Sequence, residues 1–197
     1  MGRIIAIGDV HGCHLELEDL LNQLSPREDD FLIQLGDLVN RGPSSGKVLQ
    51  LIREAGVKSI VGNHERRLLR YRWSKDASVL KKYDYDTLEE LNEEDWRYIE
   101  GMPLFHHETY MQTVFVHGGF CPNSAVPWFN QPAEILAHIQ VIDNDGRPAK
   151  RSAAPDGVPW SDSWNGPPYV IYGHTPRPRV YRTPWSLGID TACVYGG

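Results

Sequence analysis

Residues Arg3–Gly12 read RIIAIGDVHG, a short apolar run that ends in a polar, glycine-rich turn. The run Arg3–Ile7 has the length and the β-branched character of a buried strand. Leucines at mostly helical spacing over Cys13–Leu24 predict a helix directly after the turn. A strand, a turn and a helix in this order predict the first unit of an α/β fold, whose turn borders a ligand site.

The same alternation continues along the chain. Phe31–Leu35 and Val57–Val61 are strand-like, and Lys47–Ala55 between them is helical and is stopped by Gly56. This repetition predicts βαβ units and a mainly parallel sheet. Further strands are expected at Leu104–His107, Val114–Val116, Tyr169–Tyr172, Val180–Arg182 and Leu187–Ile189.

The chain is long enough for one domain, which we expect to cover residues 1–197. A charged, helical insertion is predicted at about 66–101. A loop rich in Pro and Trp is predicted at about 121–166, with one short helix near Ala133–Ile139. Within that loop, Asp143–Pro159 is expected to be a mobile surface segment.

The composition is that of an ordinary globular chain, with a formal net charge of −6 and only three cysteines. Its apolar runs are strand-sized, well short of the roughly 20 residues that a membrane-spanning helix needs. The widely spaced cysteines imply no disulfide framework, and the acidic balance argues against binding duplex nucleic acid through net charge. We therefore predict a soluble, cytoplasmic protein. A small phosphorylated substrate is still compatible with the acidic net charge, because a bound metal can supply local positive charge.

Five short segments place Asp, Asn or His beside glycine where a predicted strand ends. Loops at the carboxyl ends of strands line the ligand crevice of an open α/β sheet, so all five can converge there. Glycine lets the backbone turn sharply and lets a ligand come close. The segments are Gly8–Gly12, Gly36–Gly42, Gly62–Glu65, His117–Gly119 and Gly173–Pro176.

Side chains suited to divalent metal ions are concentrated in these segments. Carboxylate, imidazole and amide oxygen together suit Mn²⁺, Fe²⁺ or Zn²⁺. Six ligands exceed one tetrahedral site, and Asp37 can bridge two ions, the arrangement used in phosphoester hydrolysis. The candidates are Asp9, His11, Asp37, Asn63, His117 and His174.

These blocks resemble the calcineurin-like metallophosphoesterases of the phosphoprotein-phosphatase type. The likeness runs from Gly8 to Tyr195 and includes Trp160–Asp162. Asn63–Tyr71 (NHERRLLRY) and Ile189–Gly197 (IDTACVYGG) resemble the bacterial diadenosine-tetraphosphatase branch. The resemblance implies an α/β fold, an α+β sandwich of mixed β-sheets flanked by helices. It implies a metal site at the carboxyl ends of the strands.

The resemblance also implies roles for individual residues. The six candidates become the ligands of two divalent ions, expected to be Mn²⁺, with Fe, Zn, Ni or Co as alternatives. Arg41 would hold a phosphate oxygen, and His64 would protonate the leaving group while a metal-bound water attacks phosphorus. The implied activity is hydrolysis of phosphate esters or anhydrides, with a dinucleoside polyphosphate as favoured substrate. Symmetric and asymmetric cleavage both stay open.

Three features depart from the protein-phosphatase pattern. Asn40 stands where those enzymes usually have an Asp that pairs with the catalytic His. The arginine that usually follows the Trp160–Asp162 block has no counterpart in residues 163–172. The chain stops at Gly197, where relatives continue into another strand, which raises the hypothesis of a chain truncated at its C-terminus.

Asn40 leads to a prediction about the substrate. Its amide oxygen can accept a hydrogen bond from His64 Nδ1, but it carries no charge that stabilises the protonated imidazole. A weaker acid slows poor leaving groups most, and a nucleotide phosphate is a good leaving group. We therefore expect phosphoanhydrides or activated aryl esters to be favoured over phosphoserine.

Other functions stay open at this stage. A serine/threonine or dual-specificity protein phosphatase would use the same site on a phosphopeptide, although Asn40 and the missing arginine count against it. A non-catalytic metal-binding scaffold would bind metal without turnover, which the retained His64 and Arg41 make the weaker alternative. The acidic balance gives a nuclease no support. The sequence does not predict the oligomeric state.

Several basic and aromatic side chains allow two interpretations each. Arg66, Arg67 and Arg70 form either a polyphosphate-binding patch beside the site or the solvated face of a helix. A cluster of tryptophans is expected to pack in the core rather than to stack on a nucleobase. These tryptophans are Trp128, Trp160 and Trp164.

The remaining polar groups receive structural interpretations. Tyr83–Asp86 is expected at the plain surface, and Asp190 with Cys193 is expected to help close the fold near the site. No covalent enzyme intermediate is needed, so none of the cysteines is expected to act as a nucleophile.

Overall fold

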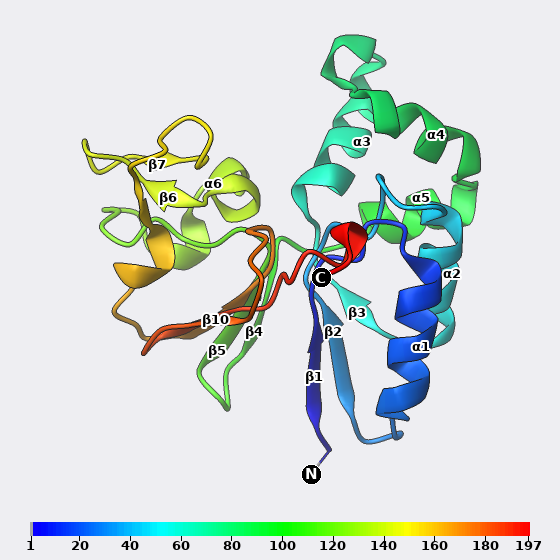
Figure 1. Ribbon diagram of the computed structural model, residues 1–197, viewed down its shortest axis with the longest axis horizontal. Coiled ribbons are helices and arrows are strands. Elements are labelled where there is room, and N and C mark those ends of the chain that lie inside the picture. The colour runs from blue at the N-terminus through cyan, green and yellow to red at the C-terminus, as the bar shows by residue number, and fades with distance from the viewer. Residues whose placement is uncertain (1) are drawn as a thin grey trace.

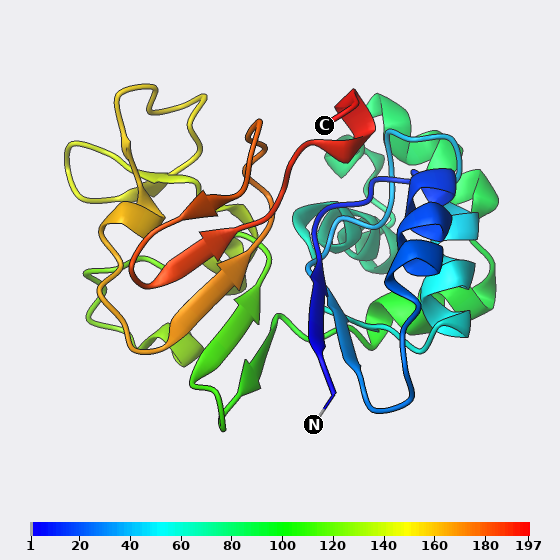
Figure 2. The same ribbon diagram turned by 60° about the horizontal axis from the view of Figure 1, so that its bottom comes forward.

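The computed structural model describes residues 2–197 and consists of two halves, each built on a β-sheet. The sheets face each other at the centre of the molecule, and helices cover the outer faces (Figure 1, Figure 2). Apolar side chains from both sheets meet between them, among them Ile33 and Leu35 from one half and Phe115 from the other. The predicted class, mixed β-sheets flanked by helices, is confirmed.

The N-terminal half holds a three-stranded parallel sheet of order β1-β2-β3. Two helices connect its strands and pack on its outer face, where Leu17, Val48 and Ile52 are buried. The alternation read from the sequence is therefore confirmed. The elements are β1 (Ile4–Ile7), α1 (His14–Leu24), β2 (Phe31–Gln34), α2 (Ser45–Glu54) and β3 (Lys58–Ser59).

Strand β3 is shorter than the predicted strand Val57–Val61. The Val61 N–H donates to Pro103 O rather than to a residue of β2, so the ladder ends early. Pairing with a residue so distant in sequence leaves no periodic signal.

A helical run follows β3 and rises above the carboxyl ends of the strands (Figure 1). It occupies the segment predicted as a helical insertion. Surface ion pairs such as Arg72 with Glu93 and Glu100 join its members, while Trp96 and Ile99 are buried. The elements are α3 (Asn63–Ser74), η1 (Ala77–Val79), α4 (Lys82–Glu90) and α5 (Glu93–Glu100).

The second half holds a five-stranded sheet of order β10-β11-β9-β5-β4. Its central strands β5, β9 and β11 are parallel, and the edge strands β4 and β10 are antiparallel to their neighbours. The strands are β4 (Phe105–Glu108), β5 (Thr113–Val116), β9 (Tyr169–Tyr172), β10 (Tyr181–Arg182) and β11 (Ser186–Gly188).

The long connection between β5 and β9 contains more regular structure than predicted. Asp143–Pro159 is not simply a loop, because it supplies two short strands that pair with both edges of β6. Strands of two residues are too short to show a sequence period. The elements are η2 (Trp128–Asn130), α6 (Ala133–His138), β6 (Val141–Ile142), β7 (Pro148–Ala149), β8 (Val158–Pro159) and η3 (Trp160–Asp162).

The tryptophans of this connection pack in the core, as predicted. Trp160 and Trp164 are buried around Phe120, and Trp128 is partly buried against the same ring. None of the helices within residues 2–197 is long and apolar enough to cross a membrane.

Candidate active site

Six strands end at one place, each followed closely by a polar side chain. Parallel strands bring their carboxyl ends to the same edge, so the two sheets together supply ligands from both halves. The last turn of the chain, η4 (Cys193–Tyr195), lies beside them. The side chains and their strands are Asp9 (β1), Asp37 (β2), Asn63 (β3), His117 (β5), His174 (β9) and Asp190 (β11).

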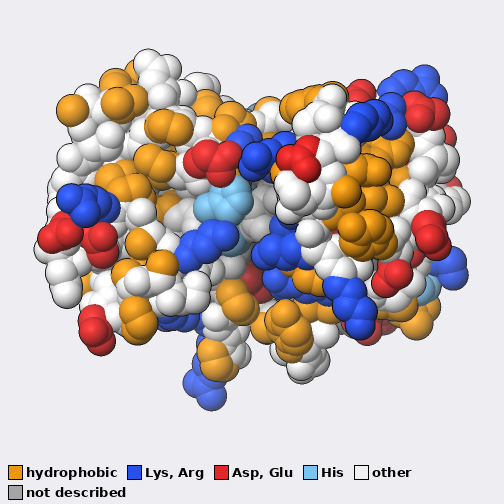
Figure 3. All heavy atoms as spheres, turned by 90° about the horizontal axis from the view of Figure 1, so that it is seen from above, with side chains coloured by type: hydrophobic (Ala, Val, Ile, Leu, Met, Phe, Trp, Pro, Cys, Tyr) orange, Lys and Arg blue, Asp and Glu red, His pale blue; other side chains and the backbone are white. Residues whose placement is uncertain are grey.

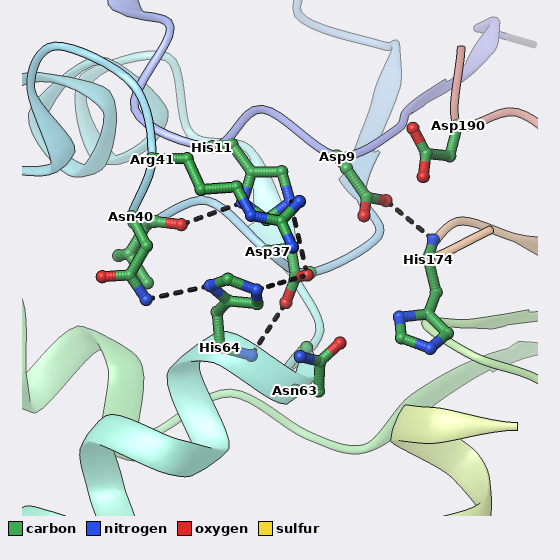
Figure 4. Close-up of polar contacts among 12 residues, drawn as sticks. Asp9, His11, Asp37, Asn40, Arg41, Asn63, His64, His174 and Asp190 are labelled. Atoms are coloured by element: carbon green, nitrogen blue, oxygen red, sulfur yellow. Dashed lines mark hydrogen bonds and ion pairs between the residues drawn. The ribbon is translucent and has the colours of Figure 1, made fainter. Parts of the chain in front are cut away.

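The predicted ligands surround a cavity of about 230 Å³. Five of them line it, and His117 lies fully buried beneath, with Nε2 3.1 Å from Asn63 Oδ1. Figure 4 shows Asp9, His11, His64 and His174, which come from both halves of the molecule, arranged around Asp37. The residues that sequence reasoning selected are therefore brought together.

Asp37 is the centre of this arrangement. Its carboxylate oxygens lie 3.6 Å from His11 Nε2 and 3.4 Å from His117 Nε2. Two groups of potential ligands share it, one with His11 and His64 and one with His117 and His174, and the donor atoms of each group lie within 4.8 Å of one another. A carboxylate common to two groups is what a bridging ligand requires.

Backbone carbonyls fix the orientation of the three candidate imidazole ligands. His11 Nδ1 lies 3.1 Å from Val39 O, and His117 Nδ1 lies 2.7 Å from Leu35 O, so each Nδ1–H donates there. His174 uses its other nitrogen, Nε2, which is 3.2 Å from the carbonyl oxygen of His138. The other nitrogen of each ring is then available to a cation, the usual outer-shell pattern of metal-binding histidines.

Glu65 braces the loop that carries Asp37. Its buried carboxylate accepts hydrogen bonds from the backbone N–H groups of Gly62, Asp37, Leu38 and Val39, at 2.8–3.2 Å. No role was predicted for Glu65 beyond its place in the Asn63–Tyr71 block. Its position explains how the tight turn holds the Asp37 carboxylate rigidly.

The backbone of the site is strained at several of the predicted residues. His11, Asp37, Asn40, Arg41 and His174 all have φ between 48° and 72°, the left-handed region that non-glycine residues rarely adopt. Such strain persists only where surrounding contacts impose it, and it gathers at functional sites.

The buried carboxylates of the site fit a cation. Burial and the nearby Asp190 raise the pKa of Asp9 well above its usual range, and burial likewise raises the pKa of Asp190. Burial also pushes the pKa of Asp37 upward, but the nearby His117 imidazole outweighs it and holds that pKa well below its usual range. Divalent ions among these oxygen and nitrogen donors would neutralise the crowded negative charge, so the residues present fit a metal centre.

Arg41, which was predicted to hold a phosphate oxygen, lines the cavity. Its Nη1 donates to His11 Nε2 at 2.9 Å, and its guanidinium lies 5.9 Å from the Tyr83 ring centroid and 5.8 Å from that of Tyr195. The two tyrosines hold the guanidinium at the mouth of the cavity, although neither was predicted to take part.

His64 lies at the N-terminus of α3, with Nε2 3.8 Å from Asp37 Oδ2. Burial, together with the positive groups of Arg67 and Arg41, lowers the pKa of His64 to about 2. The Tyr83 ring stacks on the imidazole with a centroid distance of 5.2 Å. His64 is therefore neutral and firmly oriented.

The contact between Asn40 and His64 differs from the predicted one. Asn40 Nδ2, not the amide oxygen, faces His64 Nδ1 at 2.9 Å, because the same Nδ2 also donates to Asp84 Oδ1 at 2.9 Å (Figure 4). Reversing the amide would set its oxygen against the Asp84 carboxylate. His64 Nδ1 is thus an acceptor, and the ring proton lies on Nε2.

Asp84 is the clearest site-supporting residue that sequence reasoning missed. The segment Tyr83–Asp86 was expected at the plain surface, yet Asp84 is fully buried and binds Arg67 through both oxygens, at 2.7 and 2.9 Å. The one hint of Asp84 in the sequence was Asn40. An uncharged amide beside the histidine suggests that a carboxylate from another segment supports the site.

The three arginines of α3 have different surroundings. Arg67 pairs with Asp84 and reaches His64 Nδ1 at 3.2 Å, whereas Arg66 pairs with Glu134 at 2.8 Å. Arg70 is exposed and forms no ion pair among residues 2–197. All three arginines therefore line a groove beside the site, and Arg67 also supports His64.

Comparison with known proteins places the chain in a family. Residues 2–178 match the family model described as calcineurin-like phosphoesterase, so the chain belongs to this family of metallophosphoesterases. Its members use a dimetal centre, and this protein is accordingly a hydrolase acting on phosphate esters or anhydrides.

Similar proteins carry tetraphosphatase names of two kinds. Bis(5′-nucleosyl)-tetraphosphatase PrpE [asymmetrical] from Halalkalibacterium halodurans is 29% identical, over 97% of this chain and 85% of the relative. Bis(5′-nucleosyl)-tetraphosphatase, symmetrical, from Nitrosomonas europaea is 28% identical, over 98% of this chain and 91% of the relative. A crystal structure that carries the name of a diadenosine tetraphosphatase is 30% identical, with a TM-score of 0.85 over 100% of this chain and 86% of the other.

Proposed function

We propose that this protein hydrolyses dinucleoside polyphosphates by cleaving a phosphoanhydride bond. The observation that carries the proposal is the environment of His64, whose Nδ1 accepts hydrogen bonds from Asn40 and Arg67 and faces no carboxylate oxygen directly. The names of similar proteins support the same substrate class.

The proposed ligands are the six residues predicted from the sequence: Asp9, His11, Asp37, Asn63, His117 and His174. We propose Mn²⁺ for both positions, since mixed carboxylate, imidazole and amide donors suit it. When bound, the two cations would activate a water molecule and neutralise charge on the phosphate.

The remaining steps belong to side chains of this protein. Arg41 holds an equatorial phosphate oxygen by charge-assisted hydrogen bonds and offsets the negative charge that develops there. His64 donates its Nε2–H as a hydrogen bond to the oxygen of the leaving group. Asp84 keeps that proton on Nε2, because it fixes the two donors, Asn40 and Arg67, that occupy Nδ1.

This arrangement suits a leaving group that needs little protonation. A neutral imidazole that donates a hydrogen bond is a weak proton donor, and no carboxylate at Nδ1 strengthens it. A nucleotide phosphate leaves as a stable anion, whereas a serine alkoxide requires a proton. The site therefore favours anhydrides over phosphoserine, although the reason differs from the one expected from the sequence.

The test compares the turnover of diadenosine tetraphosphate with that of a phosphoserine peptide, both with Mn²⁺-loaded protein. We expect kcat/KM for the anhydride to exceed that for the peptide by at least tenfold. Faster turnover of the peptide would support a serine/threonine protein phosphatase instead. Binding of Mn²⁺ without turnover of either would support a metal-binding scaffold.

A cytoplasmic location forms part of the proposal.

A further inference from the structure

A second cavity of about 810 Å³ adjoins the metal-site cavity. The two share Asn63, Lys81 and Lys150 on their walls, so a ligand can pass from one into the other. Figure 3 shows a hollow between the halves of the molecule, with histidine at its floor and Lys and Arg side chains around it. We call this second cavity the α3 groove.

One face of helix α3 forms the long wall of the groove. Asn63, Arg66, Arg67, Arg70 and Trp73 line it at spacings of three and four residues, which places them on one side of the helix. With a rise of 1.5 Å per residue, Trp73 lies about 15 Å along the helix from Asn63. The wall therefore runs from a proposed metal ligand to an aromatic side chain.

The charge of the groove suits phosphate. Its lining has five cationic side chains and two carboxylates, those of Glu100 and Glu134. Arg70, Lys81 and Lys150 are exposed and form no ion pair within residues 2–197. Cations that face a cavity without partners attract an anionic ligand.

The far end of the groove suits a nucleobase. Trp73 is 70% exposed, although tryptophan side chains are largely buried on average. Apolar side chains adjoin it within the same cavity, including Leu69, Val79, Met102 and Leu104. An exposed indole beside an apolar floor is a platform on which a base can stack.

The metal-site cavity is too small for a whole dinucleoside polyphosphate, because pockets for drug-sized ligands occupy roughly 300–1,000 Å³. We propose that the α3 groove binds one nucleoside 5′-phosphate portion of the substrate, with Trp73 stacking on its base. In this assignment Arg70, Lys81 and Lys150 bind the phosphate chain that leads from the metal site. The assignment rests on the proposed function and adds a base-recognition site to it.

The first test uses Trp73→Ala, with Trp73→Phe to retain stacking and Tyr110→Ala as the control. Tyr110 is even more exposed, at 81%, but lies beyond the groove, beside Gly2 and Asp29. KM and kcat are measured with Mn²⁺-loaded protein for diadenosine tetraphosphate and for p-nitrophenyl phosphate, which has no nucleoside. Trp73→Ala should raise KM for the dinucleotide about tenfold and leave p-nitrophenyl phosphate unchanged. Trp73→Phe should restore most of the loss.

A binding measurement supplies a readout independent of turnover. Calorimetric titration of metal-free protein with diadenosine tetraphosphate should show weaker binding for Trp73→Ala, while binding of inorganic tripolyphosphate stays the same. The double variant Arg70→Gln/Lys150→Gln should weaken the binding of both ligands.

The outcomes separate the two proposals. Hydrolysis of diadenosine tetraphosphate with the same KM in Trp73→Ala, Tyr110→Ala and the unaltered protein would overturn the groove assignment alone. If the unaltered protein hydrolyses p-nitrophenyl phosphate but neither binds nor hydrolyses the dinucleotide, the proposed function and the groove assignment both fail.

Discussion

Asp84 Oδ1 accepts a hydrogen bond from Asn40 Nδ2 at 2.9 Å and so joins helix α4 to the turn that carries Arg41. The same carboxylate binds Arg67, and both donors reach His64 Nδ1. Asp84 thus acts on His64 through Asn40 and Arg67. The helical segment after β3 completes the active site as well as covering it.

Replacing Asp84 tests this connection. Asp84→Asn keeps the shape of the side chain but removes the charge that holds Arg67 and orients the Asn40 amide. We expect kcat for p-nitrophenyl phosphate to fall about tenfold, the effect of losing an outer-shell partner. Affinity for Mn²⁺, measured by calorimetry, should change little. Asp86→Asn, on the exposed side of the same helix, is the control, and equal kcat in both variants would contradict the role of Asp84.

Changing Asn40 to Asp tests the leaving-group argument, but the single variant would set two carboxylates against each other. The double variant Asn40→Asp/Asp84→Asn avoids this repulsion and leaves one carboxylate beside His64 Nδ1. We expect the ratio of phosphoserine turnover to anhydride turnover to rise in the double variant, because the imidazole now gains a charged partner. An unchanged ratio would show that His64 does not set substrate preference.

A glycine substitution tests how tightly the loops of the candidate metal site are packed. Gly36 has φ = 87°, and an added Cβ would lie 2.6 Å from Gly62 N and 2.9 Å from His117 Nδ1. Gly56 has φ = 64° but open space around it. Gly56→Ala should lower the free energy of unfolding by about 1–2 kcal/mol, the cost of a left-handed residue. Gly36→Ala should lower the free energy of unfolding further and should also weaken Mn²⁺ binding. Denaturant titration measures the free energy of unfolding, and calorimetry measures Mn²⁺ binding. Equal losses of unfolding free energy in the two variants would mean that the loops around Gly36 can relax.

Thiol reagents test the expectation that no cysteine takes part in catalysis. Burial, with Cys193 nearby, raises the pKa of Cys13 to about 12, and burial also raises the pKa of Cys121 and Cys193. A thiol reacts only as the thiolate, so alkylation at neutral pH should be slow. Protein treated with iodoacetamide at pH 7 should keep its full phosphoesterase activity. Rapid loss of activity, in step with labelling of any cysteine, would contradict this.

The sequence predicts most of the fold and the composition of the site, for a physical reason. Strands such as Tyr169–Tyr172 and the residues after them are encoded locally, and parallel strands bring their carboxyl ends together. What the sequence does not show depends on contacts between distant segments. The early end of β3, the two-residue strands of the long connection and the direction of the Asn40 amide are all of this kind. Asp84 lies 44 positions from Asn40, and no local pattern marks that pairing.

The central claim is metal-dependent hydrolysis of a dinucleoside polyphosphate, and product analysis tests it most directly. Diadenosine tetraphosphate is incubated with Mn²⁺-loaded protein, with chelator-treated protein as the control, and the nucleotides are separated. We predict conversion to ADP alone, or to ATP plus AMP, only when metal is present. The product pair also shows whether cleavage is symmetric or asymmetric. Intact dinucleotide in a sample that dephosphorylates a phosphoserine peptide would contradict the account.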